Sequence, residues 1–78
     1  MLSDYTQWIG NIDELRTTAY SIAKEYNLED LDDIYSLRLV RDYVSRGLLG
    51  SVERVGKELR FNYEQLLRFI VVRIMLND

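Results

Sequence analysis

Cysteine, histidine and proline are all missing from this chain of 78 residues. Without cysteine there is no disulfide framework, and without cysteine or histidine there is no thiolate or imidazole ligand for zinc. We therefore expect no metal, no cofactor and no histidine-based catalysis. Because no proline, repeat or low-complexity tract interrupts the chain, we expect one domain over residues 1–78, built mainly from helices.

Long apolar runs are also missing. No run approaches the roughly 18 residues that a membrane-spanning helix needs. The first ten residues, MLSDYTQWIG, lack the basic start and the apolar stretch of a secretory signal. We therefore expect a cytoplasmic protein that does not insert into a membrane. We also expect no enzyme, because no nucleophile stands beside a base and no phosphate-cradling loop is present.

Charge is distributed unevenly along this acidic chain, whose net charge is −3. Residues 1–35 carry eight acidic and two basic side chains, a net charge of −6. Residues 36–78 carry eight basic and five acidic side chains, a net charge of +3. A local positive field can steer an anionic partner towards one part of such a protein. The alternative is that these are ordinary helical surfaces with charges of both signs.

Capping residues and apolar spacing predict two helices early in the chain. A short helix over residues 3–9, ended by Gly10, would brace the core as an extra N-terminal helix. Asn11 and Glu14 have the spacing of a capping box, and apolar residues then repeat at helical intervals over residues 12–26. This second helix is the most strongly indicated element of the sequence.

The acidic segment NLEDLDDIY follows that helix and predicts a short helical turn with an acidic outer side. Its carboxylates, which include Asp30, Asp32 and Asp33, lack the spacing of a calcium-binding loop. We expect residues 25–33 to present a solvated acidic face, which is the usual outcome for such a run of charges.

The second half of the chain predicts a helix, a hairpin and another helix. Ser36 is a good N-cap for a helix over residues 37–46, and Gly47 suits the left-handed residue that ends it. Two short extended runs flank Gly56 within residues 51–61, which predicts a β-hairpin with a basic tip. Such a hairpin is marginally stable alone and must pack on the helices.

The last helix opens with Asn62 and Gln65 in the spacing of a second capping box. Its apolar residues fall on two sides. One face, which we expect to meet the core, contains Tyr63, Leu66, Leu67, Ile70 and Ile74. The other contains Phe69, Val72, Met75 and Leu76. We expect the N-terminal segment around Trp8 to cover this second face, with another protein chain or a continuation of this chain as the alternatives.

This order of elements is that of a winged helix-turn-helix: a capped helix with outward arginines, a glycine stop, a hairpin with a basic tip and another capped helix. The predicted fold is thus mainly α with a small β-hairpin. A recognition helix needs long donors on its exposed face to reach base edges in the major groove. A wing needs basic residues near its turn to neutralise phosphates. The predicted parts are an N-terminal brace at 1–10, a helix-turn-helix at 11–46, a wing at 50–61 and a last helix at 62–77.

The run SLRLVRDYVSRGLLGSVERVGKELRFNYEQLLRFI resembles the DNA-binding domain of MerR-family transcription regulators. In that family a Ser-Pro-x-Thr-Leu/Ile-Arg-Tyr-Tyr helix leads through Gly-Leu-Leu into a wing of the form Arg-x-Gly-x-x-Tyr/Phe-Arg, and a Tyr-x-x-x-Asp/Gln-Leu helix start follows. The resemblance covers about half of the chain. The matching or nearly matching residues are Ser36, Leu39, Val40, Arg41, Tyr43, Gly47, Leu48, Leu49, Arg54, Gly56, Arg60, Phe61, Tyr63, Gln65 and Leu66.

The resemblance implies a sequence-specific DNA-binding domain of a bacterial transcription regulator, with double-stranded DNA as partner. The residues that it implies as DNA contacts are Arg38, Arg41, Tyr43, Arg54, Lys57 and Arg60. For three of them the sequence leaves plainer roles open: Arg41 in a surface ion pair, Tyr43 in the core and Lys57 as a solubilising turn residue. Asp42 departs from the family because it puts a negative charge on a face meant for phosphate.

The alternative function is a protein-interaction module that keeps the winged fold. Its partner, a basic protein or an antirepressor, would bind the acidic face of residues 25–33 or the apolar stripe of the last helix. The residues predicted for that contact are Asp30, Asp32, Asp33, Phe69, Val72 and Met75. The long dimerising helix expected after a MerR-like domain is not in this sequence, so a homodimer is expected only if the chain is part of a longer protein.

Overall fold

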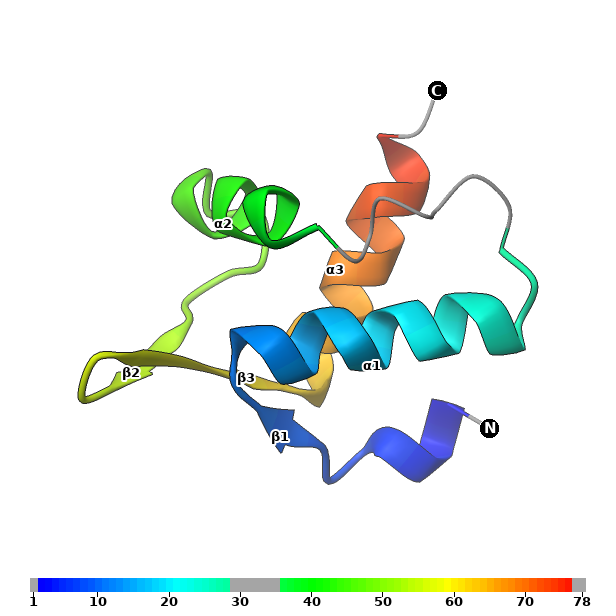
Figure 1. The fold of residues 1–78 in the computed structure, drawn as a ribbon, viewed down its shortest axis with the longest axis horizontal. Coiled ribbons are helices and arrows are strands. Elements are labelled where there is room, and N and C mark those ends of the chain that lie inside the picture. Colours follow the sequence, from blue (N-terminus) through cyan, green and yellow to red (C-terminus); the bar gives the residue numbers. More distant parts are fainter. Residues whose placement is uncertain (1, 29–35, 77–78) are drawn as a thin grey trace.

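The computed structural model describes residues 2–28 and 36–76 of the chain. The acidic segment at 29–35, with Asp30, Asp32 and Asp33, lies outside the described residues. Two capped helices, a hairpin and a final helix follow a short N-terminal turn (Figure 1). The elements are η1 (Leu2–Tyr5), β1 (Ile9–Gly10), α1 (Ile12–Glu25), α2 (Leu37–Ser45), β2 (Glu53–Val55), β3 (Glu58–Asn62) and α3 (Tyr63–Met75). The described part is therefore mainly helical, with a small antiparallel sheet.

The N-terminal segment is only partly the predicted helix. A 3₁₀ turn covers Leu2–Tyr5, but Ile9 and Gly10 form strand β1 instead of the end of a helix. This strand pairs antiparallel with β3, with Ile9 opposite Asn62 and Gly10 opposite Phe61. The prediction of a helix over residues 3–9 is therefore wrong in its second half, because pairing with a distant strand overrides local spacing.

Helix α1 begins at the predicted capping box. The Asn11 side chain accepts from the backbone N–H of Glu14 at 2.9 Å, and Glu14 Oε1 accepts from the N–H of Asn11 at 2.8 Å. The helix ends at Glu25, and Asn27 then takes a left-handed φ of 53°. Its buried side, which contains Leu15, Ala19, Ile22 and Ala23, packs into the centre of the core.

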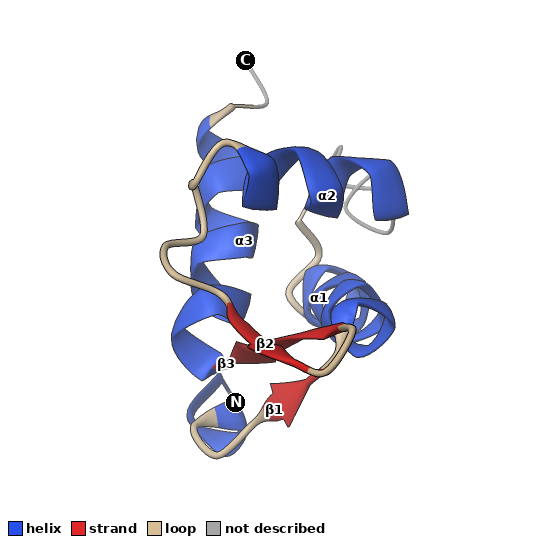
Figure 2. Cartoon of the chain, turned by 90° about the vertical axis from the view of Figure 1, so that its left-hand side faces the viewer, coloured by secondary structure: helices blue, strands red, loops and turns tan. Residues whose placement is uncertain are grey.

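Helix α2 and the hairpin also follow their sequence signals. Ser36 Oγ accepts from the N–H of Leu39 at 3.3 Å, and Gly47 lies just beyond the helix with a φ of 73°. The hairpin turn contains Gly56 with a φ of 64°, a conformation that costs other residues roughly 1–2 kcal/mol. The order of strands is β1-β3-β2, so β3 lies in the middle of the sheet (Figure 2).

Helix α3 differs from its predicted faces. Leu66, Phe69 and Ile70 are buried together, whereas Ile74, predicted to face the core, is 46% exposed. Phe69 is fully buried, so the prediction that it binds a partner is wrong. Val72 is half-buried and packs on the core. The buried side of α3 is therefore centred on Phe69, between the two faces that the sequence indicated.

The core joins all the longer elements. Its buried members come from the three α-helices, from Leu49 after α2 and from Phe61 on β3. Within the described residues, no helix is long and apolar enough to cross a bilayer.

Candidate nucleic-acid interface

Helix α2 and the β2–β3 hairpin lie at one end of the molecule. In Figure 1 both occupy the left-hand side, and in Figure 2, which faces that side, α2 lies above the hairpin with both turned to the viewer. The hairpin turn projects beyond the helices, while α1 and α3 lie further to the right (Figure 1). This end contains every residue that the sequence predicted to contact DNA.

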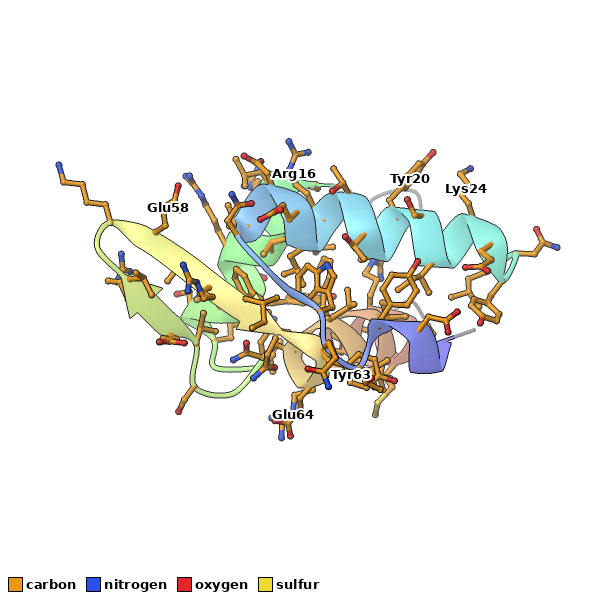
Figure 3. The ribbon with its side chains drawn as sticks, turned by 90° about the horizontal axis from the view of Figure 1, so that it is seen from below. Arg16, Tyr20, Lys24, Glu58, Tyr63 and Glu64 are labelled. Atoms are coloured by element: carbon orange, nitrogen blue, oxygen red, sulfur yellow. The ribbon has the colours of Figure 1, made fainter. Side chains whose placement is uncertain are left out.

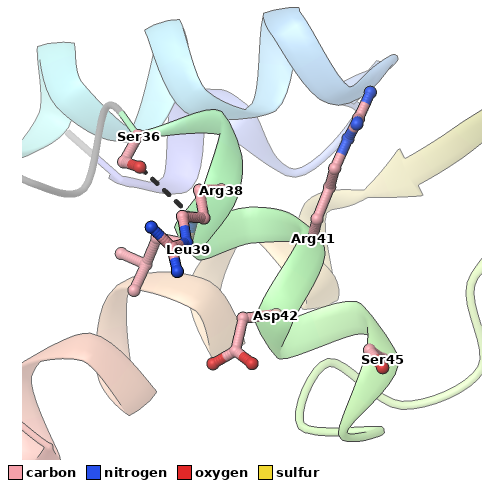
Figure 4. A pocket seen from close by; sticks show the side chains of 6 residues that line it. All are labelled: Ser36, Arg38, Leu39, Arg41, Asp42 and Ser45. Carbon is pink, nitrogen blue, oxygen red and sulfur yellow. Dashed lines mark hydrogen bonds between the residues drawn. The ribbon is translucent and has the colours of Figure 1, made fainter.

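The exposed side of α2 carries two arginines from successive turns. Arg38 and Arg41 are both exposed, and they line one hollow together with Ser36, Leu39, Asp42 and Ser45 (Figure 4). Neither arginine forms an ion pair with any residue in the ranges 2–28 and 36–76. The surface ion pair considered for Arg41 is therefore absent from the described part of the chain, and both guanidinium groups are available to an outside acceptor.

Asp42 is the acidic residue on this side of α2. Its Oδ2 lies 3.4 Å from Nε of Arg46, one helical turn further along. Both side chains are largely exposed, 47% for Asp42 and 61% for Arg46. An exposed pair of this kind adds little stability, but it offsets the negative charge that the sequence predicted would oppose phosphate. Arg46 was not among the predicted site residues, although its i, i+4 spacing from Asp42 is a readable signal for an ion pair.

Tyr43 is not on the exposed side. It is 3% exposed, and its ring meets the ring of Phe69 edge-on, with centroids 5.7 Å apart. Such contacts stabilise a core beyond the area they bury. The prediction that Tyr43 contacts DNA is therefore wrong, and the core role that the sequence left open is the observed one.

The register of the hairpin divides its basic residues between two faces. Arg54 lies opposite Leu59, and Arg60 lies opposite Glu53. Because successive residues of a strand point to opposite faces, Arg54 lies on the face of Leu59 and Phe61, which pack with the helices. Arg60 lies on the other face, across from an acidic residue.

Lys57 follows Gly56 in the turn and is exposed. Like Arg54, it forms no ion pair with the described residues. Four predicted contacts thus lie on α2 and the hairpin, at the same end of the molecule: Arg38, Arg41, Arg54 and Lys57. Arg60 lies on the other face of the hairpin from Arg54.

A buried glutamine holds the base of the hairpin in place. Gln65 is 5% exposed, and its Nε2 donates to the carbonyl oxygen of Ser51 at 2.6 Å. Its Oε1 accepts from the backbone N–H of Asn62 at 2.9 Å. One side chain therefore ties the segment before β2 to the end of β3. Sequence spacing indicated only the capping role of Gln65. Its bond to Ser51 could not be predicted, because Ser51 lies on a different segment of the chain.

Helix α1 carries basic side chains whose contacts are within the protein. Figure 3 shows Arg16, Tyr20 and Lys24 at successive turns along α1. Arg16 Nε lies 3.0 Å from Oδ1 of Asp13, and Lys24 Nζ lies 5.2 Å from the centre of the Tyr20 ring. These cations differ from the four on α2 and the hairpin, which have no such partners in the described ranges.

The opposite end of the molecule exposes apolar side chains. Met75 is 69% exposed, and its role in a partner contact stays a prediction; other apolar residues are also exposed at the ends of α1 and α3. These are Tyr26, Val71, Ile74 and Leu76. An apolar hollow lies between the two helices, with Ile22, Leu28 and Ile70 in its wall.

Residues 2–28 and 36–76 contain no group of three or more acidic side chains placed to hold a metal ion. Comparison of the chain with models of known families, with curated proteins and with solved structures found no match. The assignment of a function therefore rests on the geometry of α2 and the hairpin.

Proposed function

We propose that this chain is a double-stranded DNA-binding domain of the winged helix-turn-helix type, as the resemblance to MerR-family regulators implies. Helix α2 would enter the major groove, and the hairpin would lie on the neighbouring phosphate backbone. The observation that carries the proposal is one end of the molecule with four exposed basic residues, Arg38, Arg41, Arg54 and Lys57, and no acidic partner for them among the described residues.

The dimensions of α2 suit this role. An α-helix with its side chains is about 10–12 Å in diameter, and the major groove is about 12 Å wide and admits one helix. The nine residues of α2 give it about 13 Å of length to lie in the groove. Arg38 and Arg41 project from this helix and form no ion pair with the residues that the structure describes, so binding to DNA breaks no ion pair with those residues. Phosphate neutralisation by such side chains supplies most of the affinity of a DNA-binding domain.

The hairpin is held firmly enough to serve as a wing. A two-stranded hairpin is only marginally stable alone, but β1 adds a third strand to β3. Gln65 fixes the segment that leads into β2. Arg54 and Lys57 are therefore presented on a fixed support, which lowers the entropy cost of binding.

The proposal is tested by DNA-binding titrations at several salt concentrations, using fluorescence anisotropy with a pool of short labelled duplexes. We expect Arg41→Ala and Arg54→Ala each to weaken binding and to flatten the plot of log K against log salt by about one unit. Lys24→Ala is the matched control, because it removes one positive charge at the other end of the molecule from the hairpin (Figure 3). Equal slopes for all variants and the unaltered protein would refute the proposed contact surface.

Arg60→Ala tests the division of the hairpin into two faces. Arg60 lies across from Glu53 on the face away from Arg54. We therefore expect its replacement to change the salt slope less than the replacement of Arg54. An equal effect of the two replacements would show that the wing uses both of its faces.

A second candidate is a protein-interaction module on the same fold, supported by the exposed apolar side chains at the ends of α1 and α3. Large apolar patches on small proteins often mark interfaces. Val71→Ser and Met75→Ser should then weaken binding to a protein partner and leave DNA binding unchanged. Neither candidate gives the chain a catalytic role.

A further inference from the structure

An acidic residue on the exposed side of α2 needs an explanation if this helix binds DNA. Asp42 shares one hollow with Arg38, Arg41 and Ser45 (Figure 4). A carboxylate at this position would repel phosphate, and a helix that only bound the backbone would gain nothing from it. The position of Asp42 among exposed hydrogen-bond donors therefore indicates which bases the helix would contact.

The pair with Arg46 leaves part of the carboxylate available. Asp42 Oδ2 lies 3.4 Å from Nε of Arg46, whereas Oδ1 accepts no hydrogen bond from any residue in the described part of the chain. Arg46 thus offsets the charge of Asp42 and still leaves it one exposed acceptor oxygen. This arrangement suits a hydrogen bond with a donor in the groove.

Donors are scarce in the major groove. Cytosine offers its N4 amino group and adenine its N6 amino group, while guanine presents the acceptors N7 and O6. Aspartate accepts from cytosine N4, and arginine donates two hydrogen bonds to guanine O6 and N7. Because guanine and cytosine face each other in one base pair, a helix that presents arginine beside aspartate complements G·C pairs.

We infer that Asp42 is a specificity-determining residue of α2 that accepts a hydrogen bond from cytosine N4, beside Arg38 and Arg41 on guanine, so that the preferred half-site is rich in G·C pairs. This inference rests on the proposed DNA-binding function. It goes beyond that function because it assigns a base and a role to an acidic residue that phosphate contacts cannot explain.

The test is selection of bound duplexes from a randomised pool by the unaltered protein and by Asp42→Asn, followed by sequencing. Asparagine pairs with adenine N6 and N7. We therefore expect the unaltered protein to select cytosine at one position and the variant to select adenine there, with about a tenfold change in relative affinity. Anisotropy titrations with duplexes that differ only at this position give the affinities directly.

The outcomes separate the inference from the proposed function. If neither protein binds any duplex at low salt, the proposed function fails. If both bind and select the same base at every position, or if the variant only binds all sequences more tightly, DNA binding stands and the role of Asp42 is refuted. Matching thermal unfolding of the two proteins excludes a folding defect, which is not expected at an exposed position.

Discussion

Replacement of Gln65 by alanine tests how the hairpin is attached to the rest of the domain. Gln65 is almost fully buried, donates to the Ser51 carbonyl at 2.6 Å and accepts from the Asn62 N–H at 2.9 Å. Each lost hydrogen bond costs about 1 kcal/mol, and Ser51 is exposed, so water can reach its carbonyl oxygen in the variant. We expect Gln65→Ala to lower the free energy of unfolding by about 2 kcal/mol for its two hydrogen bonds, a large part of the stability of a small domain.

The matched control for this experiment is Glu14→Ala on α1. Glu14 makes the same capping hydrogen bond to Asn11 at 2.8 Å, but it is exposed and its side chain has no second bond to a distant loop within the described residues. We expect this control to cost about 1 kcal/mol. Urea denaturation followed by circular dichroism measures both changes, provided the slope m is unaltered. An equal loss for the two variants would show that the Ser51 bond contributes nothing, and the explanation of how the wing is held would be wrong.

Three further predictions concern positions with defined surroundings. Gly10→Ala should destabilise the domain by roughly 1–3 kcal/mol in urea titrations, because a Cβ there would lie 2.7 Å from Trp8 Cζ2 and 2.8 Å from Glu14 Cβ; unchanged stability would contradict this packing. Gly56→Ala should cost roughly 1–2 kcal/mol through its positive φ alone, since no described residue other than its chain neighbours lies within 4 Å of the added carbon, and crystal structures of the variant would show an altered turn if strain is relieved. Phe69→Ala should cost roughly 3–5 kcal/mol, and a loss below 1 kcal/mol on thermal unfolding would disagree with its complete burial.

Local signals predicted the helices of this fold well. Both capping boxes and the Ser36 cap have the expected hydrogen bonds, because a cap depends on residues only three positions apart. Strand β1 could not be predicted in this way. Ile9 and Gly10 form a strand only because they pair with β3, which lies far away in the sequence.

The sequence predicted which residue types line the candidate site, but it did not predict how those residues are arranged. The exposed arginines of α2 followed from helical spacing, whereas the burial of Tyr43 depends on Phe69, a contact between two helices. The separation of Arg54 from Arg60 depends on strand register, and a shift by one residue would exchange their faces. Such features require the tertiary structure.

The absence of a loop between β3 and α3 has a mechanical consequence. Asn62 is both the last residue of the middle strand and the N-cap of α3, so the hairpin and this helix form one continuous element (Figure 1). The exposed apolar residues near Met75 lie at the far end of this element. A protein bound there would keep a fixed orientation relative to DNA held by the wing. Because no loop separates β3 from α3, the two cannot easily change their relative angle. That angle would therefore decide which protein–DNA assemblies can form.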